Sequence, residues 1–243
     1  MNNLGLAVES EKLLSKSDGA SVKTRSIAGI TVTDVVLREP GASRIGKLPG
    51  RYITLEGRCD LPQMPLFLRG ALRELISGRR IFAAGLGNPD ITHDSLGAIT
   101  ARKIVPKLNG KSSLSAIETD VAARTGLDTA KLVRGAAREL RADCVIAIDA
   151  LACENPRRIG KTVQLSDTGF VLGSGAGKDC GELSREFLKI PTVAVGVPTM
   201  TALSALTKNR AGNFLVTAAD IDLVVEQWSE VIAEAVNELA VSD

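Results

Sequence analysis

The alternation of apolar and polar positions along the chain predicts a series of short strands. From Val22 to Leu37, apolar residues recur at every second position around Gly29, which predicts two strands joined by a turn. Cys144–Ile148 and Thr192–Val197 are almost continuously apolar, the pattern of strands buried on both faces of a parallel sheet. Shorter strand patterns occur at Tyr52–Leu55, Arg80–Ala84, Leu114–Ile117 and Thr162–Leu165.

A spacing of three and four residues between apolar positions predicts helices between these strands. The expected helices are Leu66–Ile76, a helix from Asp94 or Ser95 to Leu108, Asp128–Leu140 with Asp128 as its N-cap, a short helix over Glu182–Leu188 and a long one over Asp220–Val241. Because strands and helices alternate, we expect an α/β fold. It should have a mostly parallel sheet with helices on both faces, an antiparallel N-terminal portion, and a single domain over residues 1–243.

The composition is that of a globular protein and excludes several function classes. Hydrophobic residues make up 44% of the chain, and the net charge of +2 provides no basic surface for direct nucleic-acid binding. Aromatic residues, at 3%, are too few for base-stacking platforms. Four cysteines without a CxxC pair indicate a reduced, cytoplasmic setting. Apolar runs stay short of the ~18 residues that span a bilayer, and the N-terminus lacks a secretory pattern, so we expect no membrane partner.

Two glycine-rich segments resemble nucleotide-binding loops but lack residues that such loops need. Gly85-Leu86-Gly87 follows a predicted strand, yet position 90 is an aspartate instead of the third glycine of a dinucleotide-binding turn. The segment 173–179 (GSGAGKD) lacks the first glycine of a phosphate-binding loop and has an aspartate where Ser or Thr would bind Mg²⁺. We interpret both segments as turns and expect no cofactor.

Two residues carry weaker signals. His93 is the only histidine, so a Ser–His or Cys–His mechanism would have to use it, and a zinc site would lack its usual ligands. It either tunes the neighbouring Asp94 or is a polar residue at a helix start. Asp167-Thr168-Gly169 matches the short signature of pepsin-like proteases, although a turn aspartate is the simpler interpretation of Asp167.

Two aspartates follow predicted strands, at the edge where functional groups of open α/β sheets gather. Asp94 comes after the glycine turn and opens a helix, and Asp149 ends the apolar strand Cys144–Ile148. If the two strands are neighbours, the carboxyl groups share a proton, so that one is a base and the other an acid. Such a pair can activate water for attack on a peptide carbonyl. The alternative is that both aspartates are only caps.

A series of different short motifs, each present once, extends over most of the chain. They are Leu6-Ala7-Val8-Glu9, Gly50 to Glu56, Gly85-Leu86-Gly87-Asn88 with Thr92, Asp94 and Leu96-Gly97, Ile117-Glu118-Thr119, Ile148 to Ala152, Gln164 to Gly169, Gly173-Ser174-Gly175, Glu182-Leu183-Ser184, Ile190-Pro191 and Gly196-Val197-Pro198-Thr199. In this order they resemble the germination protease family, endopeptidases of spore-forming bacteria. A set of ordered motifs is far more specific than any single tripeptide.

The resemblance implies an atypical aspartic endopeptidase that hydrolyses small acid-soluble spore proteins during germination. The family's two catalytic aspartates fall on Asp94 and Asp149 of this chain. Its fold is similar to that of hydrogenase maturation proteases. The resemblance also implies a homotetramer, made as a zymogen during sporulation, in the cytoplasm of the spore core.

Further residues complete the expected site. Asp167 would help to shape it, and backbone N–H groups near Gly87 and Asn88 would stabilise the oxyanion. In a metal-dependent alternative, the maturation type of protease, Glu118 or His93 would bind a cation together with the aspartates. A third alternative is a catalytically silent relative that binds spore proteins.

The chain departs from the family pattern in three ways. Thr92-His93-Asp94-Ser95-Leu96-Gly97-Ala98 stands where the family usually has Thr-Pro-Asp-Ala-Leu-Gly-Pro, so a titratable residue replaces a proline before the aspartate. The region before Ile117 lacks an expected Pro-Gly-rich stretch, which indicates a missing substrate-facing loop. Five residues precede Leu6, so we expect a short or absent propeptide.

Overall fold

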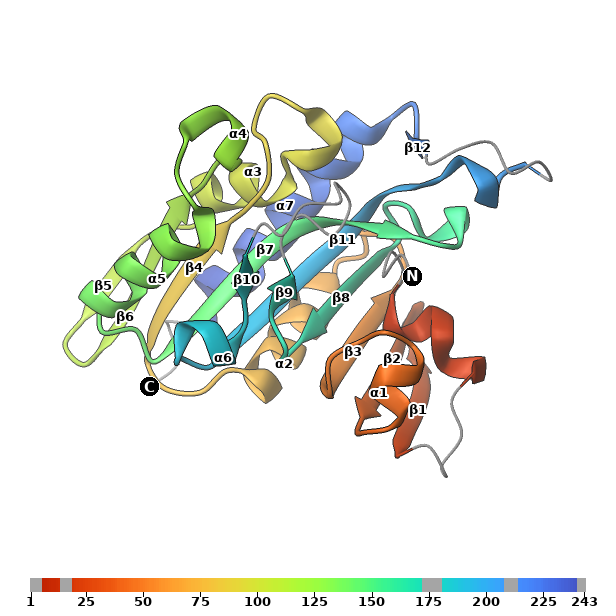
Figure 1. Ribbon diagram of the computed structural model, residues 1–243, viewed down its shortest axis with the longest axis horizontal. Coiled ribbons are helices and arrows are strands. Elements are labelled where there is room, and N and C mark those ends of the chain that lie inside the picture. Colours follow the sequence, from red (N-terminus) through yellow and green to blue (C-terminus); the bar gives the residue numbers. More distant parts are fainter. Residues whose placement is uncertain (1–5, 14–18, 172–180, 208–213, 240–243) are drawn as a thin grey trace.

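The computed structural model of the chain describes residues 6–13, 19–171, 181–207 and 214–239. Ten strands form one sheet in the order β1-β2-β3-β8-β11-β7-β4-β6-β5, and β12 pairs with the end of β11 (Figure 1). Their bounds are β1 Ala20–Ile27, β2 Ile30–Leu37, β3 Gly50–Glu56, β4 Arg80–Gly85, β5 Lys107–Asn109, β6 Ser112–Glu118, β7 Cys144–Cys153, β8 Thr162–Ser166, β11 Thr192–Ala202 and β12 Leu215–Thr217.

The centre of the sheet is parallel and its N-terminal side is antiparallel. Strands β6, β4, β7 and β11 are neighbours that run in the same direction. The meander β1-β2-β3 continues through β8, which joins β11 in antiparallel pairing. The predicted α/β fold, with a largely parallel central sheet and an antiparallel N-terminal portion, is confirmed.

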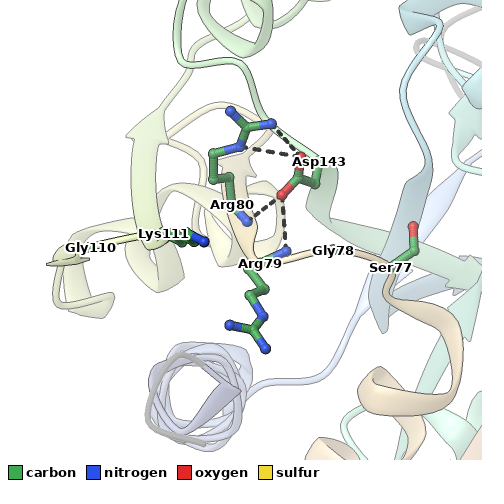
Figure 2. Close-up of a pocket in the computed structure, with 7 residues that line it drawn as sticks. All are labelled: Ser77, Gly78, Arg79, Arg80, Gly110, Lys111 and Asp143. Atoms are coloured by element: carbon green, nitrogen blue, oxygen red, sulfur yellow. Dashed lines mark hydrogen bonds and ion pairs between the residues drawn. The ribbon is translucent and has the colours of Figure 1, made fainter. Parts of the chain in front are cut away.

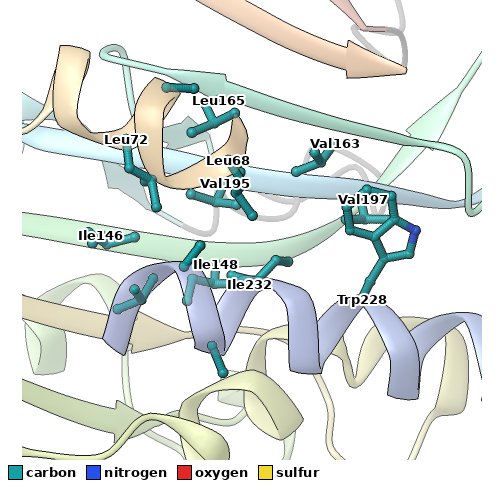
Figure 3. Close-up of a cluster of buried hydrophobic side chains, with 14 of the residues drawn as sticks. Leu68, Leu72, Ile146, Ile148, Val163, Leu165, Val195, Val197, Trp228 and Ile232 are labelled. Atoms are coloured by element: carbon teal, nitrogen blue, oxygen red, sulfur yellow. The ribbon is translucent and has the colours of Figure 1, made fainter. Parts of the chain in front are cut away.

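Helices cover both faces of the sheet, because successive side chains of a buried strand point to opposite sides. The main helices are α2 Met64–Leu75, α3 Leu96–Lys103, α5 Thr129–Glu139, α6 Arg185–Leu188 and α7 Ile221–Asn237. Ile146 and Ile148 of β7 pack in the larger core with α2, α3 and α7 (Figure 3). Val145 and Ala147 pack in a second core with α5 and α6. The expectation of helices on both faces is therefore confirmed.

The longest helix, α7, is fixed to the sheet by Trp228. This side chain is fully buried beside Val197 and Val163 (Figure 3). Its indole N–H donates a hydrogen bond of 2.7 Å to the carbonyl oxygen of Gly160. The contact satisfies the one polar atom of the indole while the ring fills the core, as buried tryptophans require.

Short elements connect the strands and helices. They are α1 Gly41–Arg44, α4 Ala122–Thr125, the 3₁₀ turns η1 Ala7–Leu13, η3 Thr92–Asp94, η4 Pro156–Arg158 and η5 Leu203–Ala205, and a small antiparallel sheet of β9 Phe170–Val171 and β10 Glu182–Leu183. Two of these, η3 and α4, lie at the carboxyl edge of the parallel strands and matter for the site described below.

Several expected boundaries are wrong, among them the end of the strand expected over Thr192–Val197, because β11 continues to Ala202. Helix α3 ends at Lys103 instead of Leu108, because Pro106 disfavours a helical conformation at the residue before it and the chain then forms β5. Strand β7 continues to Cys153, so Asp149 lies within the strand and does not end it. The expected helix over Glu182–Leu188 starts only at Arg185, because its first two residues pair with β9.

Several expectations concern residues that the structure does not describe. The glycine-rich segment 173–179, the fourth cysteine at position 180, and the last residues of the expected C-terminal helix lie outside the described residues. Among the helices that are described, α7 is the longest, and none is long and apolar enough to cross a membrane.

Candidate active site

A glycine turn at the carboxyl end of β4 folds the chain against β7. The backbone N–H of Leu86 donates a hydrogen bond of 2.8 Å to Ile148 O. Gly97 lies against both groups, because a Cβ at this position would overlap them. Gly87 has φ +98°, in the left-handed region that favours glycine, and a Cβ there would overlap the carbonyl oxygen of Asp94. The two glycines therefore allow the turn that carries Asp94 to lie beside the strand that carries the second aspartate.

Asp94 ends the 3₁₀ turn η3 and is half-buried. Its Oδ2 accepts a hydrogen bond of 2.7 Å from the backbone N–H of Asn88. Burial raises the pKa of Asp94, the Asn88 hydrogen bond and the adjacent His93 lower it, and the charge of Asp120 raises it. The net effect is a pKa above the ordinary value for aspartate, which makes Asp94 a better proton acceptor than an exposed carboxylate.

Asp149 lies on β7, in register with Gly196 of β11. Burial, and then the charge of Asp94, raise the pKa of Asp149 to about 8, against a hydrogen bond of 2.9 Å that its Oδ1 accepts from Ala150 N. Asp149 therefore keeps its proton at neutral pH, while the negative charge that acts on it belongs to Asp94.

The two aspartates thus interact electrostatically from separate elements. Strands β4 and β7 are neighbours in the sheet, which is the condition under which the sequence predicts such a pair. Two nearby carboxyl groups titrate as a unit, so that one holds the proton while the other is charged. This arrangement suits general acid–base chemistry, in which one group accepts a proton and the other donates one.

Two further charged residues stand at this edge of the sheet and are absent from the sequence-based expectation. Asp120 follows β6, the neighbour of β4 on its other side, and its charge raises the pKa of Asp94. Arg124 on α4 binds the Asn88 side chain at 2.9 Å and lies 2.7 Å from Asp90. The position of Asp120 after a parallel strand is the same signal that identifies the other two aspartates.

The model of the germination protease family matches residues 73–211, which include the glycine turn, the paired aspartates and β11. The chain belongs to the germination protease family. Germination proteases from Bacillus cereus and Geobacillus sp. support this assignment. They are 33% and 34% identical to the chain over 236 and 234 residues.

These germination proteases are longer than the chain. The alignments cover 84% of this chain but only 64% and 63% of the two relatives, so the chain spans less than two thirds of their length. The solved structure of the [NiFe] hydrogenase maturation protease HycI from Thermococcus kodakarensis is similar to 68% of this chain and 98% of its own. Its TM-score is 0.44 and its sequence identity is 19%.

The oxyanion donors expected in this member of the germination protease family are differently engaged. The Asn88 N–H donates a hydrogen bond of 2.7 Å to Oδ2 of Asp94 in the structure. Gly87 lies so close to the carbonyl oxygen of Asp94 that a Cβ would not fit between them. His93 is half-buried, and its carbonyl oxygen accepts a hydrogen bond of 2.7 Å from Thr199 on β11.

Two other expected site residues make their described contacts elsewhere. Glu118 accepts a hydrogen bond of 2.6 Å from Arg102 of α3 and forms an ion pair with it. Asp167 is exposed and accepts a hydrogen bond of 2.8 Å from the backbone N–H of Arg51. Strand β8 is antiparallel to β11, so it runs away from Asp149: Gln164 pairs with Gly196, which is in register with Asp149, and Ser166 pairs with Ala194. Asp167 follows Ser166 and therefore lies farther from Asp149 than Gln164 does. The turn interpretation of Asp167 agrees with these contacts.

No group of three or more His, Cys, Asp and Glu side chains within residues 6–13, 19–171, 181–207 and 214–239 is placed to hold a metal ion.

A cavity of about 630 Å³ lies at the opposite, amino end of the parallel strands (Figure 2). There Asp143 binds the Arg80 guanidinium at 2.6 Å and the backbone N–H groups of Arg79 and Arg80 at 3.0 and 2.9 Å. This cavity is separate from the paired aspartates.

Proposed function

We propose that the chain is a peptidase that hydrolyses small acid-soluble spore proteins during germination, with Asp94 and Asp149 as its acid–base pair. The observation that carries this proposal is the placement of the two acids: the turn that carries Asp94 is bonded to β7 next to Asp149, through Leu86 N and Ile148 O at 2.8 Å. Burial and the charge of Asp94 raise the pKa of Asp149, which agrees with this placement. Membership of the germination protease family supports the reaction class and the substrate.

The two aspartates have different tasks in this proposal. Asp94, the charged member, accepts a proton from water as the water oxygen attacks the peptide carbonyl carbon. Asp149, which holds a proton in this proposal, donates it to the carbonyl oxygen, so that a tetrahedral intermediate with two hydroxyl groups forms. As the C–N bond breaks, the proton that Asp94 took from water passes to the leaving amine, and Asp149 takes back a proton from one hydroxyl of the intermediate. The products are a carboxylic acid and an amine, and the pair again holds one proton.

The substrate must present an extended backbone to the pair. A peptide bond inside a folded element is shielded by its own hydrogen bonds, so an unfolded, basic polypeptide fits this requirement. We include in the proposal the remaining family expectations: a homotetramer, synthesis as a zymogen, and action in the cytoplasm of the spore core.

Cleavage assays with isosteric variants test the proposal. Asp94→Asn and Asp149→Asn keep the size of each side chain but remove proton exchange, so each should lower cleavage of a small acid-soluble spore protein by at least ~100-fold. Asp60→Asn, at an exposed acid that pairs with Arg58 after β3, is the matched control and should retain full activity. Circular dichroism should show all three variants folded.

Other outcomes identify the alternatives. Cleavage that a chelator abolishes and a divalent cation restores would replace the acid–base proposal by the metal-dependent one. Binding of the spore protein without cleavage, at any pH between 5 and 9, would instead identify a catalytically silent relative. Near-normal turnover by a folded Asp94→Asn or Asp149→Asn variant would remove that residue from the mechanism.

A further inference from the structure

The short helix α4 presents an arginine to the turn that holds Asp94. Arg124 Nη1 donates a hydrogen bond of 2.9 Å to Asn88 Oδ1 and lies 2.7 Å from Asp90 Oδ2. Its Nε stands 3.4 Å from Asp120 Oδ2. The planar guanidinium therefore joins the loop after β4 to the loop after β6, a geometry that a lysine does not reproduce.

Both of these loops act on Asp94. Asn88 donates its backbone N–H to Asp94 Oδ2 at 2.7 Å, while its side-chain oxygen accepts from Arg124 and, at 3.0 Å, from the backbone N–H of Asp90. Asp120 acts through its negative charge, which raises the pKa of Asp94. Arg124 thus reaches Asp94 only through other residues.

We propose that Arg124 is a positioning residue for the acid–base pair and sets its working pH range. It fixes the Asn88 N–H that binds the Asp94 carboxylate, and it compensates the negative charge of Asp120 beside that carboxylate. This inference rests on the proposed catalytic roles of Asp94 and Asp149 and adds the control of their protonation.

The charged groups around Asp94 come from several elements. His93 lies on the same 3₁₀ turn, Asp120 follows β6, and Asp149 faces it from β7. Strand β11 contacts the turn through Thr199, whose hydroxyl binds the carbonyl oxygen of His93. Helix α7 also packs against the turn, and the acids at its start, Asp220 and Asp222, are exposed to solvent.

Loss of Arg124 should raise the pKa of Asp94. Without the guanidinium, the charge of Asp120 is uncompensated and the Asn88 N–H is held less firmly, and both changes favour the protonated form of Asp94. In Arg124→Gln, the acidic limb of the cleavage profile should therefore move upward by about half a pH unit, because the contacts are partly exposed. In Asp120→Asn, the acidic limb should move in the opposite direction.

A conservative variant separates charge from geometry. Arg124→Lys keeps the positive charge but loses the planar group whose Nη1 binds Asn88 and Asp90 while its Nε stands beside Asp120. The limbs of its pH profile should stay near those of the wild type, while kcat falls by about tenfold because Asp94 is less firmly oriented. The double variant Arg124→Gln/Asp120→Asn should cancel part of the shift seen in Arg124→Gln alone.

Carboxyl ¹³C titration by NMR gives a readout that does not depend on cleavage. The Asp94 titration should move upward in Arg124→Gln and downward in Asp120→Asn, whereas Arg58→Gln, an exposed arginine paired with Asp60, should change neither aspartate. An unchanged Asp94 titration and unchanged kcat in folded Arg124→Gln would overturn the role of Arg124, even if Asp94→Asn and Asp149→Asn abolish cleavage. If Arg124→Gln does not fold, Asp120→Asn and Arg124→Lys decide the question by the same two measurements. Full cleavage by Asp94→Asn would instead overturn the proposed function while leaving the titration result intact.

Discussion

The backbone N–H of Leu86 donates its 2.8 Å hydrogen bond to the carbonyl oxygen of Ile148, the residue that precedes Asp149. This single bond links the turn that carries Asp94 to the strand that carries Asp149. The relative placement of the two acids therefore depends on backbone contacts between β4, β7 and the start of α3, and only secondarily on side-chain contacts.

Gly97→Ala tests this dependence. A Cβ at Gly97 would overlap both Ile148 O and Leu86 N, so helix α3 must move away from the sheet. We expect a loss of stability of about 2 kcal/mol, typical of overpacking, and at least a tenfold loss of cleavage. Gly70→Ala in helix α2 is the control, because nothing lies within 4 Å of its Cβ position, and it should be neutral or slightly stabilising. Equal behaviour of the two alanine variants in thermal melting would contradict the argument.

The pH dependence of cleavage should follow the split titration of the pair. Activity should fall as the pH rises through about 8, because Asp149 then loses the proton that it donates. It should also fall in acid, because Asp94 becomes protonated and stops acting as a base. Measurement of kcat/KM between pH 4 and 10 tests this bell shape, and a profile that is flat through pH 8 would exclude Asp149 as the acid.

Asp149 should also make the fold less stable at neutral pH. Its pKa rises from 3.8 to about 8 on folding, so between these values the folded chain holds a proton that the unfolded chain has released, and stability falls as pH rises through this window. Asp149→Asn removes this loss while its Oδ1 can still accept from Ala150 N. Urea unfolding should show the variant more stable than wild type by up to about 5 kcal/mol at pH 7.5, because each pH unit above 3.8 costs about 1.4 kcal/mol, and nearly equal at pH 4. A difference that is the same at both pH values would mean that the Asp149 carboxyl does not titrate in this range.

The apolar pattern identifies the central strands but not their lengths. Cys144–Ile148 and Thr192–Val197 are recognisable because a strand buried on both faces has no polar side to interrupt it. Strand β7 nevertheless continues through Asp149, since its pairing with β11 extends beyond the hydrophobic run. Strand β5 is found only in the structure, because three residues acquire strand geometry by pairing with β6 and not by their own pattern.

In the site, too, the sequence predicts the residues that follow a strand pattern but not the contacts that depend on how distant segments pack. The rule that functional groups follow parallel strands selects Asp94 and Asp149, and applied to β6 it would also have selected Asp120. The role of Arg124 depends on where the four-residue helix α4 lies, which its own sequence does not specify. The hydrogen bond from the Asn88 N–H to Asp94 cannot be predicted from a pattern of side chains, because the donor is a backbone group oriented by the turn.

A buried glutamate near the N-terminus holds the end of the strand that carries Asp149. The Glu9 carboxylate accepts backbone hydrogen bonds from Leu6, Glu154 and Asn155, at 2.8, 2.9 and 2.8 Å, and its side chain is only 4% exposed. Because both carboxylate oxygens are used, Glu9→Gln would set an amide NH₂ against a backbone N–H, which leaves one buried donor without an acceptor.

We expect Glu9→Gln to lower the free energy of unfolding by about 1 to 3 kcal/mol, the cost of an unsatisfied buried group. The fluorescence of Trp228, the only tryptophan, reports the transition. Glu39→Gln is the matched control, since the exposed Glu39 binds one backbone N–H, that of Ser43, and should change stability by less than about 0.5 kcal/mol. Hydrogen exchange should also accelerate at the amides of Glu154 and Asn155. Unaltered exchange there would show that Glu9 does not hold this end of β7, and the N-terminal segment would then have no part in placing Asp149.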